Sequence, residues 1–236
     1  MTIAQDIKND PIIDALFKAG AHYGYSRSRR HPSVKPYLFA VKNRVDIFNL
    51  EKSKELLERA VEFACQLGKE GKQVLLVAGK HEALPSIQKA ALDLGMPSVA
   101  GRWVGGTLTN FSVIRARIDK LLDLREKKKT GELAKYTKKE RLLIDREIDR
   151  LEHLFSGLTE LKSIPAALFV IDPGREHIAV EEATNVGVPV IALASSDCDI
   201  AKVTYPLVGN DTSSQSISYF VDAFVKAYHE GRSHKA

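Results

Sequence analysis

The sequence predicts an α/β fold: a doubly wound, mainly parallel sheet of the flavodoxin-like or Rossmann-like kind, with an inserted antiparallel coiled-coil hairpin of helices. The first observation behind this prediction is that short apolar runs alternate with segments of helical periodicity, as in sheets covered on both faces. The second is a charged stretch, residues 113–155, that shows no strand pattern and interrupts the alternation. We therefore expect one discontinuous α/β body, residues 1–112 and 156–236, and one inserted hairpin, residues 113–155.

The amino-terminal part predicts a short helix, a loop and a pair of strands. Apolar residues recur at helical spacing up to Gly20, which is a natural helix stop. Residues 21–36 combine prolines, serines and basic residues, which disfavour helix and strand, so we expect a structured loop there. The apolar segments 37–41 and 45–50 predict two paired strands because only a short break separates them.

The rest of the body shows repeated helix and strand units. An apolar stripe over residues 51–69 predicts an amphipathic helix, and the nearly continuous apolar run 73–79 predicts a parallel strand buried on both faces. The same two patterns predict the remaining elements. Helices are expected over residues 85–94, 176–186 and 213–228, and strands over residues 167–171 and 189–193 and at Leu207 and Val208.

Two seams of apolar residues predict the inserted hairpin. The seam residues are Ile114, Ile118 and Leu121 in the first half and Ile144, Ile148, Leu151 and Phe155 in the second. They are three and four residues apart, which is the spacing of a coiled coil. Thr130-Gly131 interrupts the pattern, and Thr137 to Glu140 matches a capping box that restarts a helix. A single long solvated helix is the alternative, because a highly charged helix needs no partner.

Composition excludes several classes of protein. The chain has 236 residues, of which 44% are hydrophobic and 28% charged, as in folded globular domains rather than disordered chains. Only Cys65 and Cys198 are present, so neither a disulfide framework nor a zinc-binding cysteine pattern is available. No secretory leader and no long apolar run is recognisable, so we expect a cytoplasmic protein without a membrane partner.

The glycine and histidine patterns do not support a nucleotide-dependent or metal-dependent enzyme. Gly79-Lys80 follows an apolar strand, but Val74 and His81 stand where a Walker A loop needs a glycine and a hydroxyl. The glycine-rich residues 101–106 lack the GxGxxG spacing of dinucleotide-binding folds. The seven histidines show no metal-ligand spacing, so we expect no cofactor and no metal.

One enzymatic alternative remains open. Asp172-Pro173-Gly174 ends a predicted strand at a position where catalytic acids often lie, and His177 follows shortly after. These residues are compatible with a sugar-phosphate-type enzyme on the same fold. A turn in which Asp172 accepts backbone hydrogen bonds is the simpler interpretation.

The strongest functional signal is the placement of basic residues. The net charge is only +5, but residues 25–44, the basic segment, contain six cations and no carboxylate. These cations are Arg27, Arg29, Arg30, Lys35, Lys42 and Arg44, and the aromatic rings Tyr23, Tyr25, His31 and Tyr37 interleave with them. Arginine matches phosphate bidentately and flat rings stack on exposed bases. Residues 113–155 are also basic, with 13 Lys and Arg against 9 Asp and Glu, so we predict a protein that binds structured RNA.

Two long ordered motifs carry a family resemblance. The first runs through Ala-Gly-Ala-His-Tyr-Gly at residues 19–24, Arg-Arg-His-Pro at 29–32 and Lys-Pro-Tyr-Leu-Phe at 35–39. The second is Arg-Trp-Val-Gly-Gly-Thr-Leu-Thr-Asn at residues 102–110. Both resemble signatures of the bacterial S-two family, the second protein of the small ribosomal subunit. The resemblance continues to residues 209–211 and spans almost the whole chain.

The resemblance implies a structural constituent of the small (30S) ribosomal subunit without catalytic residues. It implies an α/β domain with a protruding coiled-coil hairpin, bound to 16S rRNA between head and body and in contact with neighbouring ribosomal proteins. In many bacteria the family also helps recruit the large mRNA-binding protein S-one. We add Arg102, Trp103 and Asn110 to the RNA-binding candidates, although Trp103 is alternatively a core residue that fixes its loop.

The chain departs from the family at two places, and the hairpin raises a further expectation. Tyr25 stands where the family usually has histidine. Residues 195–199 read Ser-Ser-Asp-Cys-Asp where the family commonly has Asp-Thr-Asn, which leaves open whether a cation binds near Asp197 and Asp199. We expect the hairpin to be a docking arm that contributes little to the fold of the body, because its seam residues contact one another.

Overall fold

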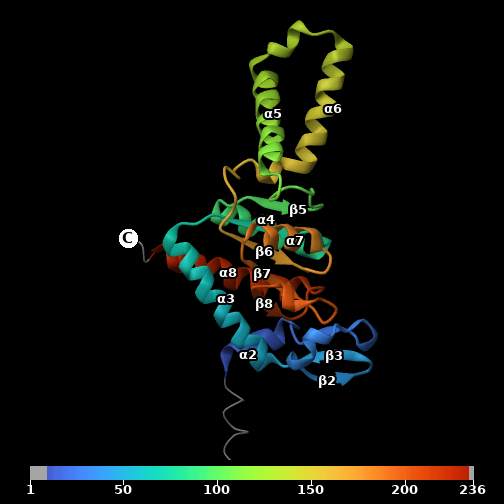
Figure 1. The fold of residues 1–236 in the computed structure, drawn as a ribbon, viewed down its shortest axis with the longest axis vertical. Helices are drawn as coiled ribbons and strands as arrows, with labels where there is room; N and C mark the ends of the chain where they lie inside the picture. Colours follow the sequence, from blue (N-terminus) through green and yellow to red (C-terminus); the bar gives the residue numbers. More distant parts are fainter. Residues whose placement is uncertain (1–9, 234–236) are drawn as a thin grey trace, which may run out of the picture.

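The computed structural model describes residues 10–233 and has a five-stranded sheet at the centre of the body (Figure 1). The strands are β4 (Val74–Ala78), β5 (Ser98–Ala100), β6 (Ala167–Ile171), β7 (Val190–Ala194) and β8 (Tyr205–Val208). They lie in the order β5-β4-β6-β7-β8, and every neighbouring pair is parallel. This is the doubly wound order of flavodoxin-like sheets, so the predicted fold class is confirmed. The edge strand β5 was not predicted, because three residues carry no periodic signal.

Helices cover both faces of this sheet. The helices of the body are α3 (Leu50–Glu70), α4 (Leu84–Leu94), α7 (His177–Val186) and α8 (Ser214–Ser233). Leu76 and Phe169 point into the core formed with α3, α4 and α8, whereas Leu75 and Leu168 point into the core formed with α7 and the hairpin. Because alternate strand residues are buried on opposite faces, the strands read as continuous apolar runs.

A small antiparallel sheet precedes the main one. After α2 (Pro11–Lys18), the strands β1 (Tyr23–Ser26), β2 (Leu38–Lys42) and β3 (Val45–Phe48) pair in the order β1-β3-β2. The predicted pairing of β2 with β3 is confirmed. The prediction of a loop throughout residues 21–36 is wrong for β1, because pairing with β3 makes a strand of a segment with poor local propensity. Two short 3-10 helices, η2 (Arg27–Arg29) and η3 (Pro32–Tyr37), follow β1.

The inserted segment is an antiparallel pair of helices that projects from the body (Figure 1). It consists of α5 (Phe111–Thr130) and α6 (Lys138–Phe155). The predicted capping box is present, since Thr137 N donates to Glu140 Oε2 at 2.8 Å and Glu140 N donates to Thr137 Oγ1 at 3.4 Å. Exposed ion pairs such as Lys120–Glu147 bridge the two helices, but solvent screens them and they add little to stability.

The base of the hairpin belongs to the core of the body. Ile118 and Leu121 are fully buried in the same cluster as Leu75 of β4 and Val170 of β6. Removal of the whole segment 113–155 would therefore uncover part of the sheet face that α7 also covers. The expectation that the body folds without the hairpin stays a prediction, and we restrict it to the distal half of the hairpin.

Candidate RNA-binding surface

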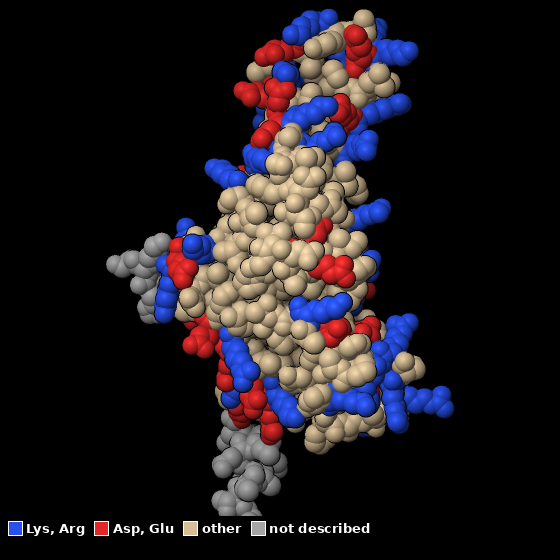
Figure 2. Space-filling view, viewed as in Figure 1, with Lys and Arg blue, Asp and Glu red and all other residues tan. Residues whose placement is uncertain are grey.

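Four of the predicted basic residues gather at the free end of the small sheet. Asn43 and Arg44 have φ angles of 52° and 64°, and they form the two-residue turn between β2 and β3. Arg27 N donates to Arg44 O at 2.9 Å, which holds η2 beside this turn. Figure 2 shows Lys and Arg side chains gathered over this end of the molecule. The exposed cations here are Arg27, Arg29, Lys42 and Arg44.

The other two cations of the basic segment have different environments. Lys35 is exposed on η3. Arg30 is half-buried: its Nε donates to Asp46 Oδ2 at 2.8 Å and its Nη2 pairs with Asp46 Oδ1. Asp46 is fully buried and needs this cation, so Arg30 holds the segment onto β3 instead of presenting a free guanidinium. No local pattern predicts this pair, because Asp46 lies just beyond the basic segment, 16 residues from Arg30.

The loop of the second motif, residues 102–110, is organised by Glu182 of α7. The Glu182 carboxylate accepts hydrogen bonds from Trp103 Nε1 at 3.1 Å, Gly106 N at 2.7 Å, Leu108 N at 2.9 Å, and Thr109 N and Oγ1 at 3.2 Å. Trp103 is only 7% exposed, so it is the core residue that fixes its loop. Arg102 and Asn110 are exposed at the two ends of the loop.

The environment of Glu182 keeps its side chain ionised. Burial alone would raise the pKa of Glu182, but the hydrogen bonds from Leu108, Trp103, Gly106 and Thr109 outweigh burial and lower the pKa. No sequence signal marks this residue, because its partners lie 73 to 79 residues earlier in the chain.

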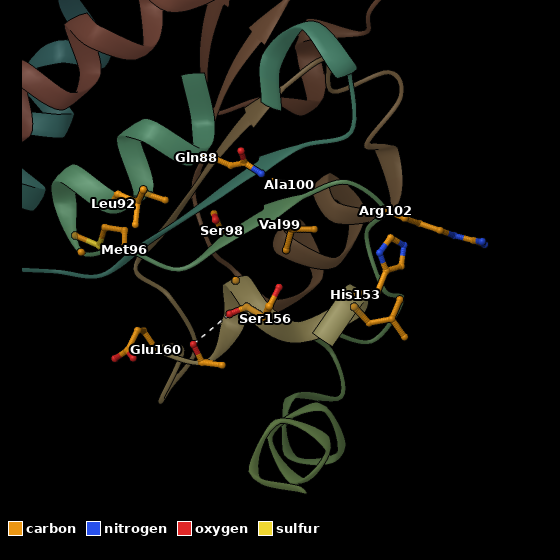
Figure 3. A pocket seen from close by; sticks show the side chains of 15 residues that line it. Gln88, Leu92, Met96, Ser98, Val99, Ala100, Arg102, His153, Ser156 and Glu160 are labelled. Atoms are coloured by element: carbon orange, nitrogen blue, oxygen red, sulfur yellow. Dashed lines mark hydrogen bonds between the residues drawn. The ribbon is translucent and has the colours of Figure 1, made fainter. Parts of the chain in front are cut away.

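A cavity of about 640 Å³ lies between α4, β5 and the base of the hairpin (Figure 3). Leu92, Met96 and Val99 supply much of its apolar wall, and its titratable members His153 and Glu160 lie on opposite sides. The guanidinium of Arg102 points away from the other lining side chains in Figure 3. Because no titratable groups converge in this cavity, it does not have the composition of an active site.

Comparison with known proteins decides the family of this chain. The family model described as ribosomal protein S2 matches residues 16–231, which include both sheets and the hairpin. The chain belongs to the ribosomal protein S2 family. The small ribosomal subunit protein uS2 of Dictyoglomus turgidum is 39% identical over 221 residues, which cover 94% of this chain and 90% of the relative. The uS2 proteins of Nitratiruptor sp. and Chlorobaculum tepidum are 38% and 37% identical, cover 92% and 93% of this chain, and are themselves covered over 81% and 88%.

In this member of the ribosomal protein S2 family, the residue considered as a catalytic acid, Asp172, has structural contacts. Asp172 has a φ of 63°, its Oδ1 accepts from Arg175 N at 3.0 Å, and its Oδ2 pairs with Lys80 Nζ at 2.7 Å. His177 is exposed at the start of α7. The interpretation of Asp172 as a turn residue that accepts a backbone hydrogen bond is therefore confirmed, and both of its oxygens are engaged.

Lys80 is the centre of a buried charge cluster that the sequence analysis did not find. Its Nζ lies 2.6 Å from Asp211 Oδ2 and 2.7 Å from Asp172 Oδ2, and it donates to Tyr25 OH at 3.1 Å. Burial opposes its charge, but the two carboxylates raise the pKa of Lys80 above its ordinary value. Burial raises the pKa of Asp211 to about 6. One signal was available: Lys80, Asp172 and Asp211 each follow a strand, and parallel strands end at one edge.

Three residues in and beside this cluster have ligand atoms close enough to share a cation. Ligand atoms of Asp172, Cys198 and Asp211 lie within 4.8 Å of one another. The ammonium of Lys80 already pairs with both carboxylates, and burial raises the pKa of the Cys198 thiol, which disfavours a thiolate ligand. These residues therefore fit the ammonium better than a metal ion. Asp199 accepts a hydrogen bond from the backbone as the cap of the following 3-10 turn.

The turn after β7 holds the basic segment against the main sheet. Tyr25 N donates to Ser196 Oγ at 2.8 Å, and His31 N donates to Ser196 O at 2.8 Å. A Cβ on Gly24 would lie only 3.0 Å from Ser196 Oγ, so glycine allows β1 to approach this turn. Both departures from the family pattern, Tyr25 and the serine-containing turn, thus take part in one contact between the two sheets.

Proposed function

We propose that the chain is a structural, non-enzymatic constituent of the small ribosomal subunit, where it binds small-subunit rRNA and contacts neighbouring ribosomal proteins. The observation that carries this proposal is the match to the ribosomal protein S2 family over residues 16–231. The free end of the small sheet supports it, because the exposed cations at and beside the β2–β3 turn suit the phosphates of folded RNA. The buried contacts of Asp172 leave no observation in favour of a sugar-phosphate-type enzyme.

We assign the phosphate contacts to the exposed cations of the basic segment and to Arg102. The assigned residues are Arg27, Arg29, Lys35, Lys42, Arg44 and Arg102, together with the exposed Asn110 at the other end of the second motif. Arg30 and Trp103 are not assigned phosphate contacts, because Arg30 pairs with Asp46 and Trp103 donates to Glu182.

The double variant Arg27→Ala/Arg29→Ala tests this function and this surface together. Binding to small-subunit rRNA should weaken, and the slope of log K against log salt should fall by about two, because each phosphate contact releases condensed counterions. Filter binding over a series of salt concentrations measures both quantities. Arg30 stays in place, because its removal would leave Asp46 buried without a cation.

The matched control is Lys69→Ala/Lys72→Ala, which removes the same charge from exposed positions at the other end of α3 and just beyond it. Its salt slope should equal that of the unmodified chain. Equal slopes for both double variants would move the RNA contact away from the basic segment. An unmodified chain that does not bind small-subunit rRNA would contradict the proposed function itself.

We infer that the distal half of the hairpin is a docking arm for RNA or a neighbouring protein. It exposes large apolar side chains far from the body, with Leu142 51% and Leu143 55% exposed. Replacing residues 122–143 with a short Gly/Ser linker should leave cooperative unfolding in urea and reduce incorporation into small subunits in a sucrose gradient. Replacing all of 113–155 should in addition destabilise the body, because it uncovers Leu75 and Val170. Normal incorporation of the shortened chain would refute the docking-arm role, and its failure to fold would refute the independence of the body from the distal half.

From the family resemblance we further propose that the chain works on ribosomes in the cytoplasm, with protein S-one as a candidate partner. Within residues 10–233 no helix has the length and apolar character needed to cross a membrane.

A further inference from the structure

A second cavity, of about 480 Å³, opens where the main sheet changes direction. It lies at the carboxyl ends of β4, β5 and β6, and it is lined by residues that follow these strands, including Gly79, Arg102, Trp103, Arg175, Glu176 and Ile178. The strand order reverses between β4 and β6, and doubly wound sheets bind their ligands at this point. The volume lies within the range of small-molecule pockets. Apart from Arg102, the proposed RNA-binding surface uses none of its exposed groups.

Two arginines give this cavity a preference for an anion. Arg102 follows β5 and Arg175 follows β6, and both are exposed. Neither guanidinium forms an ion pair within the described part of the chain. The amino-terminal turn of α7 begins beside Arg175, and the first N–H groups of a helix also favour an anion. A phosphate group matches this combination, because the guanidinium fork binds phosphate bidentately.

A buried acceptor faces the same space. Glu176 is 6% exposed and lines the cavity, yet in residues 10–233 its carboxylate accepts no hydrogen bond and forms no ion pair. Burial disfavours the charge of Glu176 and raises its pKa against the opposing effect of Arg175 and His177, and donors from a ligand would offset this cost. Gly79 makes this position possible, because a Cβ there would lie 2.1 Å from Glu176 Oε1. The cavity therefore combines cations at its rim with an acceptor of two hydrogen bonds inside.

We propose that this cavity binds one guanine nucleotide. Glu176 contacts the guanine ring, and Arg102 and Arg175 contact the phosphate. Guanine presents two adjacent donors, N1–H and N2–H₂, on its Watson–Crick edge, and a carboxylate accepts both. Adenine and cytosine present an amino group next to an acceptor nitrogen, which a carboxylate repels. Trp103 and Ile178 give the base an apolar wall. The nucleotide is an unstacked guanosine of rRNA or a free guanine nucleotide, and the first source rests on the proposed function.

The first arm of the test uses the purified full chain and guanosine monophosphate. Trp103 is the only tryptophan, so its fluorescence reports on this cavity. Guanosine monophosphate should quench this fluorescence saturably and bind about tenfold more tightly than adenosine monophosphate, the discrimination typical of one good bidentate contact. Absence of saturable quenching, or equal binding of both nucleotides, would overturn binding of the free nucleotide.

Three variants assign the contacts. Glu176→Gln should remove the tenfold preference for guanine, because a side-chain amide pairs with adenine as well. Arg175→Ala should weaken the binding of both nucleotides several-fold, while the preference for guanine over adenine stays the same. The control Arg59→Ala removes an exposed arginine of α3 outside the cavity. It should change neither the affinity for the nucleotides nor the preference for guanine. Arg175 is exposed, so its variant keeps the test informative even if Glu176→Gln unfolds the chain. Identical behaviour of all three variants would contradict the assignment.

The second arm identifies the source of the nucleotide. Kethoxal modifies N1 and N2 of accessible guanines, so it probes small subunits reconstituted with either the unmodified chain or Glu176→Gln. A guanine protected only by the unmodified chain identifies an rRNA residue as the ligand. If guanines are protected identically in both kinds of subunit and the chain binds guanosine monophosphate tightly, the ligand is a free nucleotide. A chain that binds rRNA but gives neither result contradicts the cavity proposal alone, whereas one that binds the nucleotide but not rRNA contradicts the proposed function alone.

Discussion

Replacing Glu182 with alanine should lower the free energy of unfolding by about 3 to 5 kcal/mol, because several donors lose their acceptor and each unsatisfied buried donor costs about 1 to 3 kcal/mol. The donors come from the Trp103 indole and from the backbone of residues 106–109. Urea denaturation of the full chain measures the loss. Glu181→Ala is the matched control, since this neighbour on α7 is exposed and carries the same charge. Its effect should stay within about 0.5 kcal/mol.

The contribution of Glu182 should also depend on pH. Its pKa is lowered from the ordinary value of 4.5, so the folded state binds fewer protons than the unfolded state in that range. The resulting stability is fully present above pH 4.5 and is lost as the pH falls through the lowered pKa. The difference in unfolding free energy between the unmodified chain and Glu182→Gln should therefore be constant near neutral pH and shrink in acid. A difference that does not change in acid would show that the carboxylate charge is not what organises residues 102–110.

Replacing Lys80 with methionine should lower the free energy of unfolding by about 3 to 5 kcal/mol near neutral pH, because it leaves the carboxylates of Asp172 and Asp211 without their cation. The second substitution Asp211→Asn, added to this variant, should restore part of the loss because an amide needs no counterion. Lys89→Met is the control, since Lys89 is exposed on α4 and its ion pair with Asp222 is a surface contact of 3.6 Å. Equal losses for Lys80→Met and the double variant would mean that Lys80 acts through packing alone.

The loss in Lys80→Met should increase with pH. Burial raises the pKa of Asp211 to about 6 from an ordinary 3.8, so the folded state holds a proton that the unfolded state releases between these values. Stability therefore falls as the pH rises through this window. Removal of the Lys80 ammonium raises the pKa of Asp211 further and widens the window. Urea denaturation should show a larger loss at about pH 8 than at about pH 5. The same loss at both pH values would contradict this assignment.

Elements with local signals could be predicted from the sequence. The apolar run that forms β4, the seams of α5 and α6 and the capping box at Thr137 are visible in short windows, and the structure contains all of them. β1 and β5 could not be predicted, because their residues become strands only by pairing with β3 and β4. Backbone pairing is a property of two segments, so a window on one segment carries no sign of it.

The sequence by itself determined the α/β class, the inserted hairpin, the family and the presence of an uncompensated basic segment, because periodicity, motif order and charge are local properties. Only the tertiary structure decided the role of each charged residue. Arg30 pairs with Asp46, Glu182 organises a loop more than 70 residues earlier, and Lys80 pairs with Asp211 across 131 residues. The physical reason is that folding removes these groups from water, and a buried charge is stable only beside a partner that the fold supplies.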